Sequence, residues 1–232
     1  MSDARGDLVP ATAEVLGRGA GTRPLRWLVA VTLLLGVLAA VGMIAAAPAG
    51  DRTFAGLSNA VQVLMSVTLP FTGVLLARDV LRSPATARLT PALLAAALLA
   101  AAVGAAGVLV CAAALAVAPD RAAVPKWDHV AYIALGSVLV QIVAQLVGTG
   151  LGLLLRPVAV ACLATIVLPL GLWLVLGSVA VLRPAQAWLT PFATVHHLLS
   201  GEMSALGWGQ WLVVVLVWPV ALNAVGAARL TR

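Results

Sequence analysis

The segment Arg78-Asp79-Val80-Leu81-Arg82-Ser83-Pro84-Ala85-Thr86-Ala87-Arg88-Leu89-Thr90 separates two long apolar stretches of this 232-residue chain. Four charged side chains fall within these residues, although only 9% of the whole chain is charged. Lys and Arg collect in the cytoplasmic loops of membrane proteins. The segment therefore predicts a cytoplasmic loop between two membrane spans, and it orients the spans on either side.

The composition is that of a membrane protein. Hydrophobic residues make up 62% of the chain and the mean hydropathy is +1.09, whereas soluble domains are about half apolar and about a quarter charged. The formal net charge of +6 would suggest a nucleic-acid partner in a soluble protein. Here the basic residues sit in loops without interleaved aromatics, so we expect no nucleic acid. Both cysteines lie in apolar runs and are predicted to be free.

Six stretches are long enough to cross a bilayer, since about 20 apolar residues span its hydrocarbon core. Residues 1–24 precede them as a polar cytoplasmic segment, in which Ala11–Leu16 form one or two helical turns or belong to a mobile tail. Arg156-Pro157 interrupts a very long apolar run and is predicted to form a tight cytoplasmic turn. The predicted spans are 25–47, 58–77, 91–118, 130–155, 157–178 and 208–227.

The loop charges orient these spans. With both termini inside, ten basic residues face the cytoplasm and four face outside, while the eight acidic residues divide equally, as the positive-inside rule requires. In the long connection 179–207, Thr190-Pro191 is typical of a helix start and Ser200-Gly201 of a helix end. The predicted fold is an all-α integral membrane protein with six transmembrane helices, both termini cytoplasmic, and a short external helix between spans five and six.

The ionisable side chains all lie in loops or at span ends. Such groups inside spans mark proton relays, ion pathways and catalysis, so a proton-coupled antiporter and an intramembrane protease are disfavoured. The only lysine, Lys126, follows no glycine-rich loop, which excludes a Walker A nucleotide site. His196 and His197 point about 100° apart on a helix and make a poor metal site with Glu202. We expect no catalytic, cofactor or metal site; an enzyme using the outer histidines is the least favoured hypothesis.

Two polar stripes run along spans two and four. In packed membrane helices, small residues allow close approach and amides hydrogen-bond across the contact, at roughly 1 kcal/mol each. The stripes therefore serve helix packing, or one of them lines a substrate path; the residue pattern leaves both interpretations open. The stripe of span two is Asn59, Gln62, Ser66 and Gly73, and that of span four is Ser137, Gln141, Gln145, Gly148 and Gly152.

A series of short motifs follows span one: Gly148-Thr149-Gly150-Leu151-Gly152, Leu155-Arg156-Pro157, Leu168-Pro169-Leu170, Trp188-Leu189-Thr190-Pro191, Leu199-Ser200-Gly201-Glu202-Met203, Trp218-Pro219 and Asn223-Ala224-Val225-Gly226. In their order and layout over most of the chain, these motifs resemble the permease subunits of ABC-2 type transporters. The resemblance implies that residues 25–232 form one six-span permease domain, which dimerises with the same or a homologous chain and pairs with separately encoded ABC ATPase subunits.

The resemblance also implies roles for single residues. In that family the loop between spans two and three contacts the ATPase as a coupling helix, and spans two and five form the dimer seam and the path. Carried over, the ATPase-coupling residues are Arg78, Asp79, Val80, Leu81, Arg82 and Arg88. We expect Ser83-Pro84 to end a short helix here and Thr90-Pro91 to begin span three. With the polar stripes, the candidate path or packing residues are Asn59, Gln62, Ser66, Gln141, Gln145 and Thr165.

The function predicted from the sequence is the membrane-spanning permease subunit of an ATP-driven exporter in a bacterial cell membrane. The subunit itself is expected to be non-catalytic, with ATP bound by the partner ATPase. The resemblance leaves the substrate open among drugs, lipids, polysaccharide precursors and peptides. The alternative is a non-transporting membrane anchor or assembly subunit of a larger complex, in which the polar stripes only pack helices.

Overall fold

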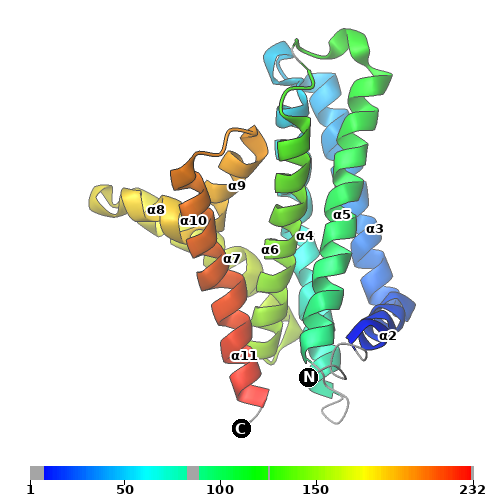
Figure 1. The fold of residues 1–232 in the computed structure, drawn as a ribbon, viewed down its shortest axis with the longest axis vertical. Helices are drawn as coiled ribbons and strands as arrows, with labels where there is room; N and C mark the ends of the chain where they lie inside the picture. The colour runs from blue at the N-terminus through cyan, green and yellow to red at the C-terminus, as the bar shows by residue number, and fades with distance from the viewer. Residues whose placement is uncertain (1–7, 83–88, 125, 231–232) are drawn as a thin grey trace.

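The computed structural model describes residues 8–82, 89–124 and 126–230, and the regular elements of this part of the chain are all helices (Figure 1). Six helical segments are long and apolar enough to cross a membrane, so the predicted number of spans is confirmed. The last segment is interrupted by a π-helical stretch. The spans are α3 (Arg23–Ala46), α4 (Phe54–Arg82), α5 (Leu89–Val117), α6 (Val130–Leu154), α7 (Val158–Ser178), and α10 (Ala205–Val215) with η5 (Leu216–Ala221) and α11 (Leu222–Leu230).

Shorter helices precede or connect the spans. Because the number of spans is even, α2 and the end of α11 lie at the same end of the bundle (Figure 1). That end carries most of the arginines of the described residues, so its cytoplasmic placement follows the positive-inside rule and stays a prediction. The short helices are α2 (Leu8–Gly21), η1 (Ala49–Asp51), η3 (Pro119–Arg121), η4 (Ala180–Leu182), α8 (Arg183–Leu189) and α9 (Pro191–Ser200).

Helix α4 forms the centre of the bundle. In the most apolar 18-residue stretch of α4, 56% of the residues are buried, whereas this share is 17% in α3 and in α7. Helix α4 packs against α3, α5, α6 and α7. Phe54, Leu57, Val61, Met65 and Leu69 of α4 are fully buried in the main core cluster. The outer helices instead expose large apolar side chains over much of their length, as a surface in contact with lipid does.

Glycines bring α4 and α6 into close contact. A Cβ added at Gly148 would collide with the Pro70 carbonyl of α4, and one at Gly152 would lie 2.8 Å from the Cβ of Ala77. Conversely, a Cβ at Gly73 of α4 would lie 2.5 Å from the Gln145 carbonyl. Small residues allow such backbone approach in membranes. The two helices therefore pack backbone against backbone along one half of their length.

The predicted boundaries hold to within a few residues except at α4. This helix is described from Phe54 to Arg82. We expected residues 78–82 to form a separate short helix, but they belong to the last turns of α4. Residues 83–88, including Arg88, lie outside the described residues, and Leu89 and Thr90 belong to α5.

The other connections differ only in detail from the predictions. The turn at Pro157 lies between α6 and α7, and α9 begins after its predicted cap, Thr190. One additional helix, α8, was not predicted. Ala11–Leu16 belong to α2, a helix of 14 residues, so the mobile-tail interpretation is wrong for this part. The half-buried side chains of α2 recur at helical spacing, and the helix packs against α5.

Candidate functional site

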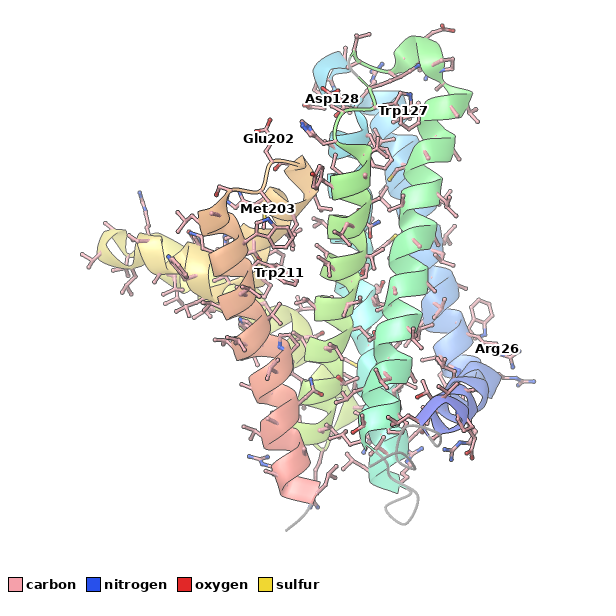
Figure 2. The ribbon with its side chains drawn as sticks, in the orientation of Figure 1. Arg26, Trp127, Asp128, Glu202, Met203 and Trp211 are labelled. Atoms are coloured by element: carbon pink, nitrogen blue, oxygen red, sulfur yellow. The ribbon has the colours of Figure 1, made fainter. Side chains whose placement is uncertain are left out.

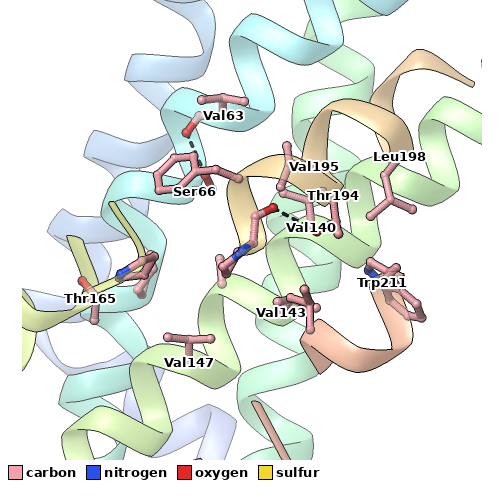
Figure 3. Close-up of a pocket in the computed structure, with 16 residues that line it drawn as sticks. Val63, Ser66, Val140, Val143, Val147, Thr165, Thr194, Val195, Leu198 and Trp211 are labelled. Atoms are coloured by element: carbon pink, nitrogen blue, oxygen red, sulfur yellow. Dashed lines mark hydrogen bonds between the residues drawn. The ribbon is translucent and has the colours of Figure 1, made fainter. Parts of the chain in front are cut away.

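A cavity of about 80 Å³ lies between α4, α6, α7, α9 and α10 (Figure 3). Thr165 of α7 and Trp211 of α10 lie on opposite sides of it in the close-up. Most of the lining is Val, Leu and Pro, and none of the lining side chains among the described residues is titratable. The cavity is therefore suited to an uncharged molecule or group and offers no acid or base for catalysis.

The polar side-chain groups of the lining residues are the indole N–H of Trp211 and three hydroxyls, on Ser66, Thr165 and Thr194. Each hydroxyl donates to the backbone carbonyl three residues before it: Ser66 Oγ to Val63 at 2.7 Å, Thr165 Oγ1 to Cys162 at 2.7 Å, and Thr194 Oγ1 to Pro191 at 2.9 Å. A hydroxyl that has already donated its proton can still accept hydrogen bonds. These groups therefore present acceptors to a ligand.

Prolines at matching positions add two backbone acceptors to the same walls. Pro70 lies within α4 and Pro169 within α7, and both line the cavity. A proline inside a helix has no N–H for the carbonyl four residues before it. The carbonyls that lose this donor belong to Ser66 and Thr165, the two residues whose hydroxyls also line the cavity. The two walls thus carry the same Ser/Thr-x-x-x-Pro arrangement on facing helices.

Helix α9 borders the cavity together with the four spans. It lies nearer the middle of the bundle than the ends of α4, α5 and α6 (Figure 1). The indole Nε1 of Trp218, within η5, donates to the Leu189 carbonyl at the end of α8 at 2.8 Å. This bond joins the α8–α9 pair to the last span, because Leu189 immediately precedes the cap of α9.

Of the predicted path or packing residues, only Ser66 and Thr165 line the cavity. Gln62 and Gln141 are fully buried between α4 and α6. The Gln141 Nε2 donates to the backbone carbonyl and the Oε1 of Gln62, at 2.9 and 2.7 Å, and the Gln62 Nε2 donates to the Gly104 carbonyl of α5 at 3.1 Å. The structure therefore uses these two amides to join three helices.

Gln145 makes a second buried contact one turn further along α6. Its amide is satisfied when Nε2 faces the Leu69 carbonyl at 2.7 Å and Oε1 accepts from Thr72 Oγ1 at 2.9 Å. Asn59, near the start of α4, is half-buried, and its Oδ1 has no hydrogen-bond partner. Neither residue lines the cavity. Among the predicted path or packing residues, the glutamines therefore pack helices together, whereas Ser66 and Thr165 face the cavity.

The described coupling residues form the last turns of α4. Asp79 and Arg82 are exposed, while Val80 and Leu81 are half-buried. The Nε of Arg78 is buried and has no hydrogen-bond partner. These residues lie at the same end of the bundle as α2 and the end of α11 (Figure 1). Arg88 lies outside the described residues, so five of the six predicted coupling residues occupy one helical segment.

Asn223 in the last span was not predicted as a packing residue. Its Nδ2 donates to the carbonyls of Pro219 and Leu146, each at 2.7 Å, and its Oδ1 accepts from Thr149 Oγ1 at 3.1 Å. Pro219, inside the π-helical stretch, is the sequence signal for this irregularity. The bonds of Asn223 join α11 to α6.

The outer histidines do not form a metal site with acidic neighbours. Within the described ranges, no group of three or more His, Cys, Asp or Glu side chains is placed to hold a metal ion. His196 and His197 are exposed on α9. Both cysteines are free, as predicted.

Comparisons with protein-family models, with curated proteins and with solved structures find no match to this chain.

Proposed function

We propose that this chain is the membrane-spanning subunit of an ATP-driven exporter, and that the cavity beside Ser66 and Thr165 is part of its substrate path. The observation that carries the proposal is the position of this cavity between four spans and the partly inserted helix α9. Its lining contains no titratable group for a proton relay. The energy for transport then has to reach the cavity through helix movements driven from outside the bilayer.

Helix α4 is the element through which that movement would reach the cavity. It runs without a break from Ser66 and Pro70 on the cavity wall to the charged turns that end at Arg82. At 1.5 Å per residue, the sixteen residues from Ser66 to Arg82 span about 24 Å. In the proposed complex an ABC ATPase, which binds the ATP, contacts this end of α4, as the resemblance to ABC-2 type permeases implies.

The lining also indicates the kind of substrate. The cavity presents apolar side chains, two aromatic rings and hydrogen-bond acceptors, namely hydroxyl oxygens and the two carbonyls released by proline. A substrate group that complements these walls is uncharged, largely apolar, and carries a hydroxyl or N–H donor. In the functional complex, a second permease chain, identical or homologous, would extend the path beyond the volume enclosed by one chain.

Co-expression with any ABC ATPase subunit that proves to be encoded beside the gene tests the proposal. We expect the two proteins to co-purify and, in lipid nanodiscs, to hydrolyse ATP faster than the ATPase alone. As a control, an ATPase that lacks its Walker A lysine should form the complex without hydrolysis. A chain that never associates with the neighbouring ATPase would contradict the proposal.

The alternative, a membrane anchor or assembly subunit, has one observation in its favour: the buried amides of Gln62, Gln141 and Gln145 serve packing. Ser66→Leu distinguishes the two functions, because it fills the cavity from the wall of α4. A transporter should lose export with the complex intact, whereas an anchor should keep its cellular phenotype. Leu94→Phe, at an exposed position of α5 away from the cavity, is the matched enlargement and should leave export unchanged.

A further inference from the structure

A second pocket, of about 570 Å³, lies between the start of α6 and the link from α9 to α10. Its lining includes the Glu202 carboxylate, the rings of Tyr132 and Trp208, and the thioether of Met203. Leu198 borders both this pocket and the cavity beside Ser66. We propose that this pocket binds a small organic ammonium cation, with Glu202 as its counter-ion and Tyr132 and Trp208 as the aromatic faces.

The charge of the lining favours a cation. Among its lining residues in the described chain, Glu202 is the only acidic one, His129 is the only histidine, and neither Lys nor Arg is present. The carboxylate makes no ion pair within 4.0 Å in that part of the structure. Figure 2 shows it directed toward the open end of the bundle, above Met203. An unpaired carboxylate at the rim attracts a positive ligand through its charge, since no Lys or Arg among the lining residues of the described chain offsets that charge.

The aromatic rings supply the second feature of a cation site. Ammonium groups bind over the faces of Trp and Tyr, and quaternary ammonium ligands are recognised in this way. The ring of Trp208 packs edge-on against Trp211, with centroids 5.7 Å apart and planes at 86°. Trp211 in turn lines the cavity beside Ser66. Packing against a second ring fixes the orientation of Trp208, so less side-chain entropy is lost when a ligand binds.

The backbone beneath the pocket is held in an uncommon conformation on both sides. His129 at the start of α6 has φ 54°, and Gly201 at the end of α9 has φ 79°; they are the two positive-φ residues of the described chain. A Cβ at Gly201 would lie 2.5 Å from the Cβ of His129. Non-glycine residues in the left-handed region persist where surrounding contacts enforce them, and they cluster at ligand sites. His129 and Gly201 both line the pocket, so the start of α6 and the end of α9 approach each other closely there.

Choline and its uncharged isostere 3,3-dimethylbutan-1-ol test the proposal directly. Titration calorimetry is run on the full chain in nanodiscs of phosphatidylglycerol, which carries no choline. We expect saturable choline binding in the millimolar range and binding of the neutral isostere at least about 5-fold weaker, because only choline gains from the carboxylate and the ring faces. Equal affinity for the two ligands, or no saturable choline binding up to about 50 mM, would overturn the proposal.

Variants locate the site. Glu202→Gln and Trp208→Leu should each weaken choline binding about 5-fold or more, while Tyr132→Phe, which keeps the ring, should retain it. The matched controls are Asp120→Asn, in η3, and Trp173→Leu, a tryptophan of α7 with the same 37% exposure as Trp208; both should bind choline normally. If Glu202→Gln and Trp208→Leu also bind normally, the rings serve only as membrane-interface residues and the proposal fails.

The ammonium group has two possible sources, a soluble cation or the headgroup of a choline lipid. Repeating the titration in phosphatidylcholine nanodiscs separates them. Loss of the choline signal there assigns the site to a lipid headgroup, whereas an unchanged signal assigns it to a soluble cation. The inference does not rest on the exporter function: choline binding can be present in a chain that associates with no ATPase, and absent in one that does.

Discussion

Gln141 joins α4 to α6 through its Nε2, while its own buried Oε1 has no hydrogen-bond partner in the structure. Its amide donates twice to Gln62, which itself bonds to α5. Ser137 lies one turn earlier on the same face, but its buried Oγ has no hydrogen-bond partner in the structure. Two polar residues of one stripe thus differ in energetic role, because losing a bonded partner leaves a buried group unpaired, whereas losing an unbonded hydroxyl does not.

The first prediction follows from this difference. Gln141→Leu should lower the free energy of unfolding by about 1–3 kcal/mol, since it leaves the buried Oε1 of Gln62 without its donor. Ser137→Ala should change stability little or raise it slightly. Thermal unfolding of the detergent-purified protein, followed by its intrinsic tryptophan fluorescence, measures both. A Ser137→Ala loss as large as that of Gln141→Leu would contradict this account.

The glycine contacts give a second prediction. Gly148→Ala should destabilise the protein by about 1–3 kcal/mol, because the new methyl group meets the Pro70 carbonyl and the helices have to separate. Gly171→Ala in α7 is the matched control, since no atom lies within 4 Å of its added Cβ. That substitution should be neutral or stabilise by up to about 1 kcal/mol. The same unfolding assay would detect the contrast, and similar losses at both positions would argue against close α4–α6 packing.

Among the elements, α4 joins the charged end of the bundle to the cavity. The double substitution Val80→Asp with Arg82→Ala should abolish stimulation of the ATPase, or uncouple hydrolysis from export, while membrane insertion stays normal. The reason is that Arg82 is exposed and Val80 half-buried on the last turns of the helix, so the changes alter the proposed ATPase contact and not the core. ATPase activity of the nanodisc complex is the measurement.

The control for this prediction is Arg121→Ala. Arg121 is an exposed arginine in η3, at the opposite end of the bundle. It should leave the coupling unchanged. Should the double variant hydrolyse ATP and export as the wild type does, the end of α4 is an ordinary loop boundary and the energy enters elsewhere.

The bond from Trp218 to Leu189 gives a prediction for α8 and α9. Trp218→Phe keeps an aromatic ring in the core but removes the Nε1 donor. The α8–α9 segment should then open more often, because its link to the last span is weakened. Hydrogen exchange followed by mass spectrometry should show faster exchange in residues 183–200, with α4 and α6 unchanged. Uniformly unchanged exchange would mean that packing alone holds the segment.

The elements were predictable to different degrees, for physical reasons. Six spans follow from hydropathy because a bilayer demands about 20 apolar residues from each. The bounds of α4 do not follow from hydropathy, since a helix that continues beyond the hydrocarbon core no longer needs apolar residues. Helix α8 and the π-helical stretch depend on local contacts, such as the bond of Trp218, that hydropathy does not encode.

The cavity was only partly predictable for a similar reason. Ser66 was recognised in the polar stripe of span two, and Thr165 because the resemblance to ABC-2 type permeases makes span five part of the path. The lining residues Phe192, Val195 and Trp211 were missed as part of a site, since an apolar side chain that faces a cavity has the same sequence signature as one that faces lipid. Gln62 and Gln141 show the converse case, in which polar residues of a span serve packing and lie away from the cavity.

At the scale of the whole molecule, the distribution of charge predicts the orientation. Single cysteines in a background without Cys111 and Cys162 test it in intact cells. Arg121→Cys should react with a membrane-impermeant maleimide, whereas Arg229→Cys, at the other end of the bundle, should react only after lysis. The reverse pattern would invert the orientation and move the proposed ATPase contact to the wrong side of the membrane.

The pairing of Gln141 with Gln62 also has a consequence for biosynthesis. The two residues are 79 positions apart, and chains are elongated at about 5–20 residues per second. Gln62 is therefore synthesised roughly 4–16 seconds before its partner amide exists. Until then, the polar face of span two has to be shielded by the insertion machinery or remain near water. Helix α4, with a mean hydropathy of 1.8 the least apolar of the six spans, should be the one whose insertion depends on a helix made later.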